Sequence, residues 1–145
     1  MREPALRWLL LLGSSRADDA LMRDALARLD QCGAASLLTP IQRFAADDGS
    51  ARQFHNALAT WDVTDTSAGA HTRIRQIELA LGRDRTRTDE VAIDIDLLAC
   101  FIDGQWHAHA HALDKREFDR ALVRGLLRQA GVVVVRDEAP TRGVS

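Results

Sequence analysis

The sequence predicts an α+β domain with a ferredoxin-like sandwich, in which helices pack against a mainly antiparallel sheet. Short apolar runs that end at turn residues indicate strands, and segments with apolar residues at helical spacing lie between them. The predicted order is strand, helix, strand, strand, helix, strand, hairpin, helix, strand. A split βαβ core with the helices on one face of an antiparallel sheet is the simplest architecture that accommodates this order.

The individual elements follow from local patterns. Residues 7–12 are an apolar run that ends at Gly13, which is typical of a buried strand followed by a turn. Residues 17–31 have helical periodicity, with Ser15 as a candidate N-cap and Gly33 as a stop signal. The remaining predicted elements are a strand at 34–40, a polar loop at 41–53, a strand at 54–63, a helix at 67–82, a loop at 83–90, a strand at 91–102, its hairpin partner at 105–113, a helix at 115–130 and a strand at 131–135.

Composition and charge limit the classes of function. The chain has 145 residues, of which 46% are hydrophobic and 28% charged, and its formal net charge is -2. These values predict one globular domain at 1–138 with a loose tail at 139–145, and they give no global positive field for binding nucleic acid. Cys32 and Cys100 lack a metal-ligand spacing, and no segment is long enough to span a membrane. We therefore expect a soluble cytoplasmic protein, monomeric or weakly dimeric.

Two aspartates stand out in the apolar segment "VAIDIDLLAC". Asp94 and Asp96 are two residues apart, so in a strand they share one face, with their Cα atoms about 6.5 to 7 Å apart. Carboxylates at this spacing suit Mg²⁺, which accepts one or two of them and completes its shell with water and phosphate oxygens. The pattern thus predicts a nucleotide site, although one face of an antiparallel sheet often faces water and the pair also fits that interpretation.

Basic residues precede the aspartates. The stretch "IELALGRDRTR" contains Glu78 at the end of a helix, followed by Arg83, Arg85 and Arg87 in a loop. Guanidinium groups beside a carboxylate pair suit a triphosphate, because they neutralise oxygens that gain charge during phosphoryl transfer. The loop also holds three acidic residues that balance the three arginines, so a self-paired surface loop is an alternative.

The histidines of "WHAHAHAL" form a separate candidate. His107, His109 and His111 would share one face of a strand, and imidazoles are common ligands of zinc, nickel and copper. Three histidines so spaced are too spread to reach one ion without a bend in the strand. An incidental polar face of the hairpin is therefore the favoured interpretation.

Five motifs together resemble a known enzyme family. They are "LLGSS", "FHNALA", "RQIELALGRDR", "AIDIDLL" and "KREFDRAL", and they occur in the family's order over residues 7–130. In this order they resemble 6-hydroxymethyl-7,8-dihydropterin pyrophosphokinase. The resemblance implies transfer of a pyrophosphoryl group from ATP to the pterin alcohol in folate biosynthesis, with release of AMP and with two Mg²⁺ ions as cofactors.

The resemblance also implies roles for individual residues. Asp94 and Asp96 would hold the magnesium ions and act in catalysis with loop residues, whereas Asn56 would bind the edge of the pterin. The further implied residues are Arg83 and Arg85 as catalytic, Phe54 and Phe118 as substrate-binding, and Glu78, Arg87, His111 and Arg116 as binding the nucleotide or its phosphates.

Departures from the family pattern support an alternative function. Val91 or Ala92 stands where the family has an arginine, and residues 83–92 contain no aromatic residue to place against the pterin. "LGSS" also replaces the usual "LGSN" at Ser15. The alternative is a catalytically weakened homologue that serves as a nucleotide- or pterin-binding module or as a partner protein.

Overall fold

The computed structural model describes residues 5–45, 49, 51–82 and 92–136. The strands are β1 (Leu6–Ser14), β2 (Ala35–Leu37), β3 (Gln42–Ala45), β4 (Gln53–Val63), β5 (Asp94–Ile102), β6 (Gln105–Ala108) and β7 (Val134–Val135). The helices are α1 (Ala20–Cys32), α2 (Ser67–Ala80), α3 (Ala110–Asp114) and α4 (Ala121–Ala130), and a 3₁₀ turn, η1 (Glu117–Asp119), precedes α4. The tail at 139–145 and the loop at 83–90 lie outside the described residues.

The strands form one mixed, mostly antiparallel sheet, which confirms the α+β class. The sheet is seven-stranded, in the order β2-β4-β1-β5-β6-β7, with β3 also paired to β4. Strand β4 lies between β1 and β2, and β1 lies between β4 and β5, so the connections through α1 and α2 each span an intervening antiparallel strand. This is the split βαβ arrangement of a ferredoxin-like fold. The parallel β6–β7 pair extends it.

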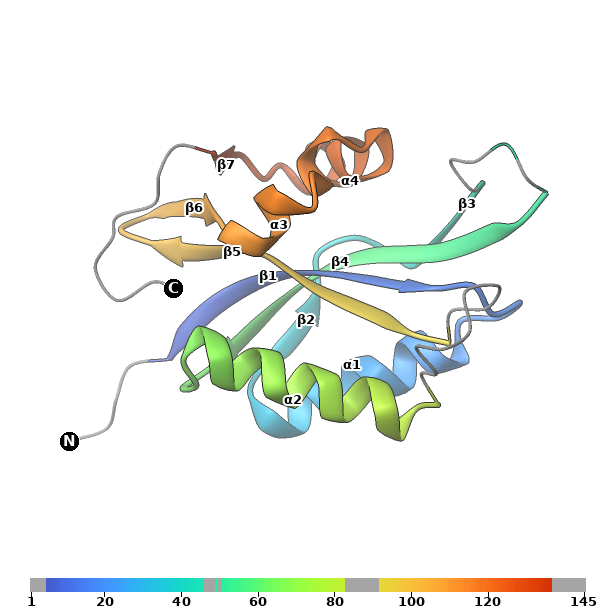
Figure 1. The fold of residues 1–145 in the computed structure, drawn as a ribbon, viewed down its shortest axis with the longest axis horizontal. Coiled ribbons are helices and arrows are strands. Elements are labelled where there is room, and N and C mark those ends of the chain that lie inside the picture. The colour runs from blue at the N-terminus through green and yellow to red at the C-terminus, as the bar shows by residue number, and fades with distance from the viewer. Residues whose placement is uncertain (1–4, 46–48, 50, 83–91, 137–145) are drawn as a thin grey trace.

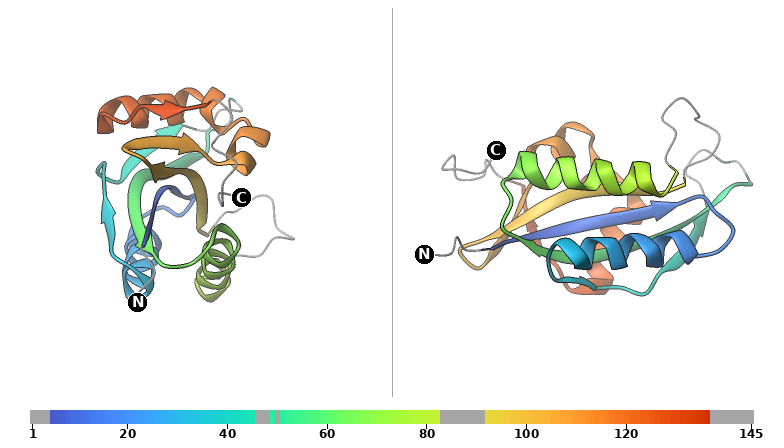
Figure 2. Two further views of the ribbon diagram at one scale, coloured as in Figure 1. Left: turned by 90° about the vertical axis from the view of Figure 1, so that its left-hand side faces the viewer. Right: turned by 90° about the horizontal axis from the view of Figure 1, so that it is seen from below.

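The helices cover both faces of the sheet, so the expectation of helices on one face is wrong. Figures 1 and 2 show α1 and α2 side by side on one face, with α3 and α4 on the other. Alternate residues of β1 serve the two faces: Leu10 and Leu12 pack in the core of α1 and α2, whereas Leu9 and Leu11 pack in that of α4. A central strand that is buried on both faces has a continuous run of apolar residues, and "WLLLL" in β1 is such a run. Neither face of such a strand is exposed to solvent.

Several element boundaries differ from the sequence predictions. Part of the predicted polar loop is strand β3, which pairs with β4. Helix α1 begins at Ala20 after Asp19, so Ser15 is not its N-cap. The hairpin at Asp103-Gly104 is confirmed, and both of its residues have positive φ, as a tight turn between strands requires.

The predicted helix at 115–130 is interrupted, and that prediction is wrong in its first part. Arg116 has φ 58° and ψ 35°, in the left-handed region, and it introduces the 3₁₀ turn η1. Arg120 is extended, with φ -75° and ψ 131°, and α4 begins only at the next residue. The helical geometry is therefore interrupted twice, at Arg116 and at Arg120, and these interruptions change the directions of the side chains between α3 and α4.

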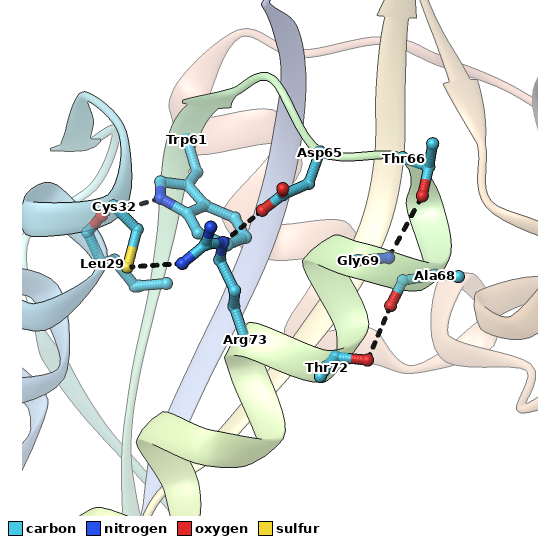
Figure 3. Close-up of polar contacts among 9 residues, drawn as sticks. All are labelled: Leu29, Cys32, Trp61, Asp65, Thr66, Ala68, Gly69, Thr72 and Arg73. Atoms are coloured by element: carbon cyan, nitrogen blue, oxygen red, sulfur yellow. Dashed lines mark hydrogen bonds and ion pairs between the residues drawn. The ribbon is translucent and has the colours of Figure 1, made fainter.

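Polar contacts tie α1 and α2 to β4 (Figure 3). The indole Nε1 of Trp61 donates to the carbonyl of Leu29, at 2.8 Å. Arg73 of α2 forms an ion pair with Asp65, and its Nη1 lies 3.8 Å from Cys32 Sγ at the end of α1. These contacts fix the helical layer that supports the sheet beneath the candidate site. No helix among the described residues is both long and apolar enough to cross a membrane.

Candidate active site

Neighbouring strands place the candidate residues in two rows across the sheet. In one row, Gly13 of β1 lies between Asn56 of β4 and Asp94 of β5. In the next row, Leu11 of β1 is paired with Asp96 of β5. Because alternate residues of a strand share a face, these side chains lie on the face that α4 covers. Residues 13, 56 and 94, distant in sequence, thus meet at one end of the sheet.

A pocket of about 130 Å³ opens over these two rows. It brings together four residues proposed from the sequence, Phe54, Asn56, Asp94 and Asp96. The other lining residues are Leu11, Gly13, Phe44, Ala45, Arg120 and Leu122. Small-molecule sites typically have about 300–1,000 Å³, so a nucleotide bound here would extend beyond the pocket.

Asn56 has an unsatisfied acceptor in this pocket. Its Nδ2 donates to the carbonyl of Leu12, at 3.3 Å, and the residue is buried. Its Oδ1 has no hydrogen-bond partner among the described residues. A buried amide oxygen without a partner is costly, and a ligand that supplies an N–H donor would satisfy it. The amide is therefore suited to the polar edge of a ring.

Asp94 and Asp96 form a partly buried, mutually repelling pair. The Asp96 side chain is 16% exposed. Burial raises the pKa of Asp96 to about 8; the negative charges of Asp94 and Glu117 and a hydrogen bond with Asp94 act in the same direction, whereas Lys115 opposes them. Two carboxylates this close are stabilised by a proton or by a cation between them. The pair therefore offers the oxygen ligands that a divalent cation prefers, and the repulsion between its two negative charges favours the binding of a cation.

Lys115, the single lysine of the chain, supplies positive charge to the pair. Its Nζ lies 3.1 Å from Asp96 Oδ1 and 3.6 Å from Glu117 Oε2. Burial lowers the pKa of Lys115, but Asp96, through charge and a hydrogen bond, and the charges of Glu117 and Asp94 outweigh burial and leave this pKa raised. The other oxygen of Glu117, Oε1, lies 3.0 Å from Arg120 Nη1. A chain of alternating charges thus connects Asp96 to Arg120, both of which line the pocket.

Comparison with known proteins identifies the family. The family model for 7,8-dihydro-6-hydroxymethylpterin-pyrophosphokinase (HPPK) matches residues 9–123. The chain belongs to this family. A search of curated proteins gives no match. HPPK membership implies a diphosphokinase-type transferase that moves a pyrophosphoryl group in folate biosynthesis, and the matched range includes both rows of the pocket.

Glu78, expected in the nucleotide pocket of an HPPK protein, contacts the strand that carries the aspartates. It is 2% exposed, and its Oε2 accepts a hydrogen bond of 2.9 Å from the backbone N–H of Ile95. This N–H lies between Asp94 and Asp96, on a part of β5 that among the described strands pairs with β1 alone. Glu78 therefore stabilises the open edge of the strand from which both carboxylates project.

Three other residues implied by the HPPK resemblance lie away from the pocket lining. Phe118 is 2% exposed in the core beneath α4, with the Arg136 guanidinium 5.4 Å from its ring centre. Arg116 pairs with Asp119 and its side chain is 80% exposed. His111 belongs to α3 and meets the ring of His71, at 5.9 Å between centroids.

The histidine segment does not form the predicted strand face. His107 is in β6, His109 precedes α3 and His111 is within α3, because the strand ends at Ala108. In the part of the chain that the structure describes, no group of three or more His, Cys, Asp or Glu side chains is placed to hold a metal ion. Mg²⁺ needs only one or two carboxylates from a protein, so the aspartate pair remains compatible with such a site.

Some site residues were missed in the sequence, and others lie outside the described part. Phe44, Lys115 and Glu117 were not singled out, and Arg120 lies within the predicted helix at 115–130. The spacing of Glu117 and Arg120 is the local signal for their ion pair, but the burial of Glu117 depends on the fold. The catalytic-loop candidates Arg83, Arg85 and Arg87 and the departure at Val91 lie outside the described residues.

Proposed function

We propose that this HPPK protein transfers the pyrophosphoryl group of ATP to the hydroxymethyl oxygen of 6-hydroxymethyl-7,8-dihydropterin and releases AMP. The observation that carries the proposal is that Asn56, Asp94 and Asp96 line the same pocket. The amide oxygen of Asn56 can accept a hydrogen bond from the edge of a ring. The carboxylates of Asp94 and Asp96, in the same pocket, can bind magnesium and through it phosphate. Both ends of the proposed reaction would thus be positioned on β4 and β5, the two strands that flank β1 in the sheet.

The ring of the pterin would bind at the β3–β4 end of the pocket. Phe44 and Phe54 are directly opposite each other across these two strands and both line the pocket. Flat aromatic side chains stack favourably on a planar heterocycle, while Asn56 Oδ1 would accept from a ring N–H. Phe118 is buried elsewhere, so we assign the aromatic contacts to Phe54 and Phe44.

The phosphates would bind at the β5 end, where Asp94 and Asp96 would hold two magnesium ions. The two carboxylates would hold them there, and the bound ions would supply positive charge that neutralises the phosphates. The contribution of the chain is position: β5 holds the two carboxylates on one face, and Glu78 fixes the backbone between them. The hydroxymethyl oxygen would bond to the β-phosphorus as the bond from this phosphorus to the AMP oxygen breaks.

The proposed activity is tested by AMP release. The full chain is incubated with ATP, Mg²⁺ and the dihydropterin, and we expect AMP only when all three are present. AMP no higher than that formed by the Asp94→Ala, Asp96→Ala double variant would contradict the proposal.

A weakened homologue remains the second candidate, because residues 83–92 contain no aromatic residue. It would bind a non-hydrolysable ATP analogue in calorimetry without forming AMP. AMP formation with all three components would exclude it.

Gly13→Ala is expected to weaken binding of the pterin by about tenfold. A Cβ at this position would lie 2.8 Å from Asn56 Nδ2, so the amide must move. Fluorescence titration with the dihydropterin would measure the change. Asn56→Ala is the comparison: the double variant should lose little more than either single variant, because both act through one contact. Unchanged affinity in Gly13→Ala would contradict the role of Asn56.

Magnesium binding is expected to strengthen as pH rises from 6 to 8. The raised pKa of Asp96, about 8, means that this carboxyl retains a proton below that pH, and the proton must leave before a cation binds. The gain approaches about tenfold per pH unit in this range. Calorimetry in buffers of different ionisation enthalpy would count the released proton. Equal affinity at pH 6 and 8 would contradict the raised pKa, and Asp96→Asn should abolish the proton release.

A further inference from the structure

The only lysine of the chain contacts a carboxylate that the proposed metal site requires. Lysine and arginine number 19 in total, and residue 115 is the only lysine among them. The Lys115 Nζ lies 3.1 Å from Asp96 Oδ1, and the Asp96 side chain is 16% exposed. Carboxylate oxygens are the protein ligands that Mg²⁺ prefers. The ammonium group of Lys115 and a metal ion at the aspartate pair would therefore use the same carboxylate.

A divalent cation bound by Asp96 would lie close to the positive charge of Lys115. Burial lowers the pKa of Lys115, but the charge of Asp96, a hydrogen bond with it and the charges of Glu117 and Asp94 outweigh burial and leave this pKa raised. The lysine is therefore ionised at neutral pH. Like charges a few ångströms apart repel strongly where the protein partly excludes water. The contact between Lys115 and Asp96 thus opposes the binding of a metal ion.

Glu117 provides Lys115 with a second partner. Its Oε2 lies 3.6 Å from Lys115 Nζ, and its Oε1 lies 3.0 Å from Arg120 Nη1, which holds this buried carboxylate in place. The backbone N–H of Lys115 donates to the carbonyl of His111, at 3.0 Å, so the main chain is fixed as well. The Lys115 side chain is 43% exposed and has room to move. Rotation of this side chain alone can therefore bring the ammonium group closer to Glu117 and away from Asp96.

The choice of lysine over arginine fits a contact that is broken during function. Lysine has a compact ammonium group on a flexible stem, whereas arginine has a planar fork that can bind both oxygens of one carboxylate. An arginine at position 115 would hold Asp96 more firmly and would be harder to displace. The one lysine in a chain that otherwise uses arginine thus occurs where a displaceable cation is needed.

We propose that Lys115 is a displaceable counter-ion of Asp96, which competes with divalent cations for this carboxylate and moves to Glu117 when a cation binds. The proposal rests on the proposed function for the place of the metal ions. Lys115 lowers the affinity of the pocket for a free divalent cation. A cation that also binds the phosphates of a nucleotide gains further contacts, so displacement of Lys115 is favoured when metal and nucleotide bind together.

Titration of the full chain with Mn²⁺ alone tests the proposal, with the free ion measured by electron paramagnetic resonance. Mn²⁺ takes the same oxygen ligands as Mg²⁺. Lys115→Met keeps an unbranched side chain without its charge, and we expect it to bind Mn²⁺ about tenfold more tightly than the wild type. Loss of Lys115 also favours a proton on Asp96, but a divalent ion gains about twice as much from the lost repulsion as a proton does. Lys115→Gln should show the same gain.

Two further variants separate the contact with Asp96 from a general effect of charge. Lys115→Arg keeps the positive charge and adds the fork, so we expect it to bind Mn²⁺ about threefold or more weakly than the wild type. Arg128→Gln removes a positive charge from an exposed residue of α4 outside the lining of this pocket, and its affinity should equal that of the wild type. Thermal melts without metal would show that each variant is folded at the temperature of the titration.

The proposal predicts opposite changes for the neutral and the arginine variants. It would be overturned if Lys115→Met and Lys115→Gln bound Mn²⁺ no more tightly than the wild type, if Lys115→Arg bound as tightly as Lys115→Met, or if Arg128→Gln showed the same gain. AMP release by the wild-type protein tests the proposed function separately. AMP formation together with equal Mn²⁺ affinities in the wild type and Lys115→Met would refute this proposal and leave the proposed function standing.

Discussion

Replacing both Asp94 and Asp96 by asparagine is expected to reduce magnesium-dependent AMP formation at least about a thousandfold. Asparagine keeps the size of each side chain but removes the charge that would hold the metal ions. The measurement is AMP release with saturating ATP, Mg²⁺ and dihydropterin. Asp103→Asn with Asp114→Asn is the matched control, since it removes two exposed carboxylates near β5 and α3 and should leave the rate unchanged.

The same substitution at Asp96 alone should stabilise the protein at alkaline pH. The pKa of Asp96 is raised in the folded state, so the folded protein holds this proton more tightly than the unfolded chain does. Stability therefore falls as pH rises from about 4 towards 8, as the folded protein is forced to ionise. Asp96→Asn should remove this loss, a gain of about 1 to 3 kcal/mol at pH 9. An inactive Asp96→Asn protein that is less stable than the wild type at pH 9 would contradict the conclusion that ionisation of Asp96 destabilises the fold.

Gly33→Ala is expected to destabilise the fold by about 3 kcal/mol or more, lowering the melting temperature by about 10 °C. A Cβ at residue 33 would lie 2.0 Å from the carbonyl oxygen of Asp62 and 2.6 Å from Val63 Cγ1. The conformation itself is extended, with φ 175°, so the requirement for glycine comes from the close approach of the β4 backbone. The clash involves main chain, which gives way only if α1 or β4 moves.

Gly125→Ala is the control for this prediction. Gly125 is in α4, and an added Cβ would meet nothing within 4 Å. Alanine is the better helix former, so this variant should be more stable by about 0.5 to 1 kcal/mol. Thermal denaturation of both variants would give opposite signs, and a Gly33→Ala protein as stable as the wild type would contradict the packing of α1 on β4.

The sequence predicted most of the strands and helices in order, but it missed β3 and α3 and did not predict the layers. Alternation along β5 correctly separated the face of Asp94 and Asp96 from that of Ile95, because the two faces have different chemistry. Along β1 every residue from Trp8 to Leu12 is apolar, so periodicity carries no information about which side is covered. The second helical layer follows from this double burial.

The site was predictable where the residues occur on regular strands. Asn56 and the aspartate pair keep the face that strand alternation assigns to them. Arg120 was not predictable, because apolar residues from Phe118 onward fit one helix, whereas in the structure the buried carboxylate of Glu117 and its ion pairs with Lys115 and Arg120 accompany a broken one. Such a tertiary preference overrides a local periodic pattern.

The fate of the β-phosphate tests the central claim most directly. The full chain is supplied with ATP labelled at the β-phosphorus, Mg²⁺ and 6-hydroxymethyl-7,8-dihydropterin, and the products are separated. We expect the label in the pyrophosphorylated pterin, with unlabelled AMP formed in equal amount. Label recovered only in ATP, in ADP or in free pyrophosphate would contradict pyrophosphoryl transfer at the pocket of Asn56, Asp94 and Asp96.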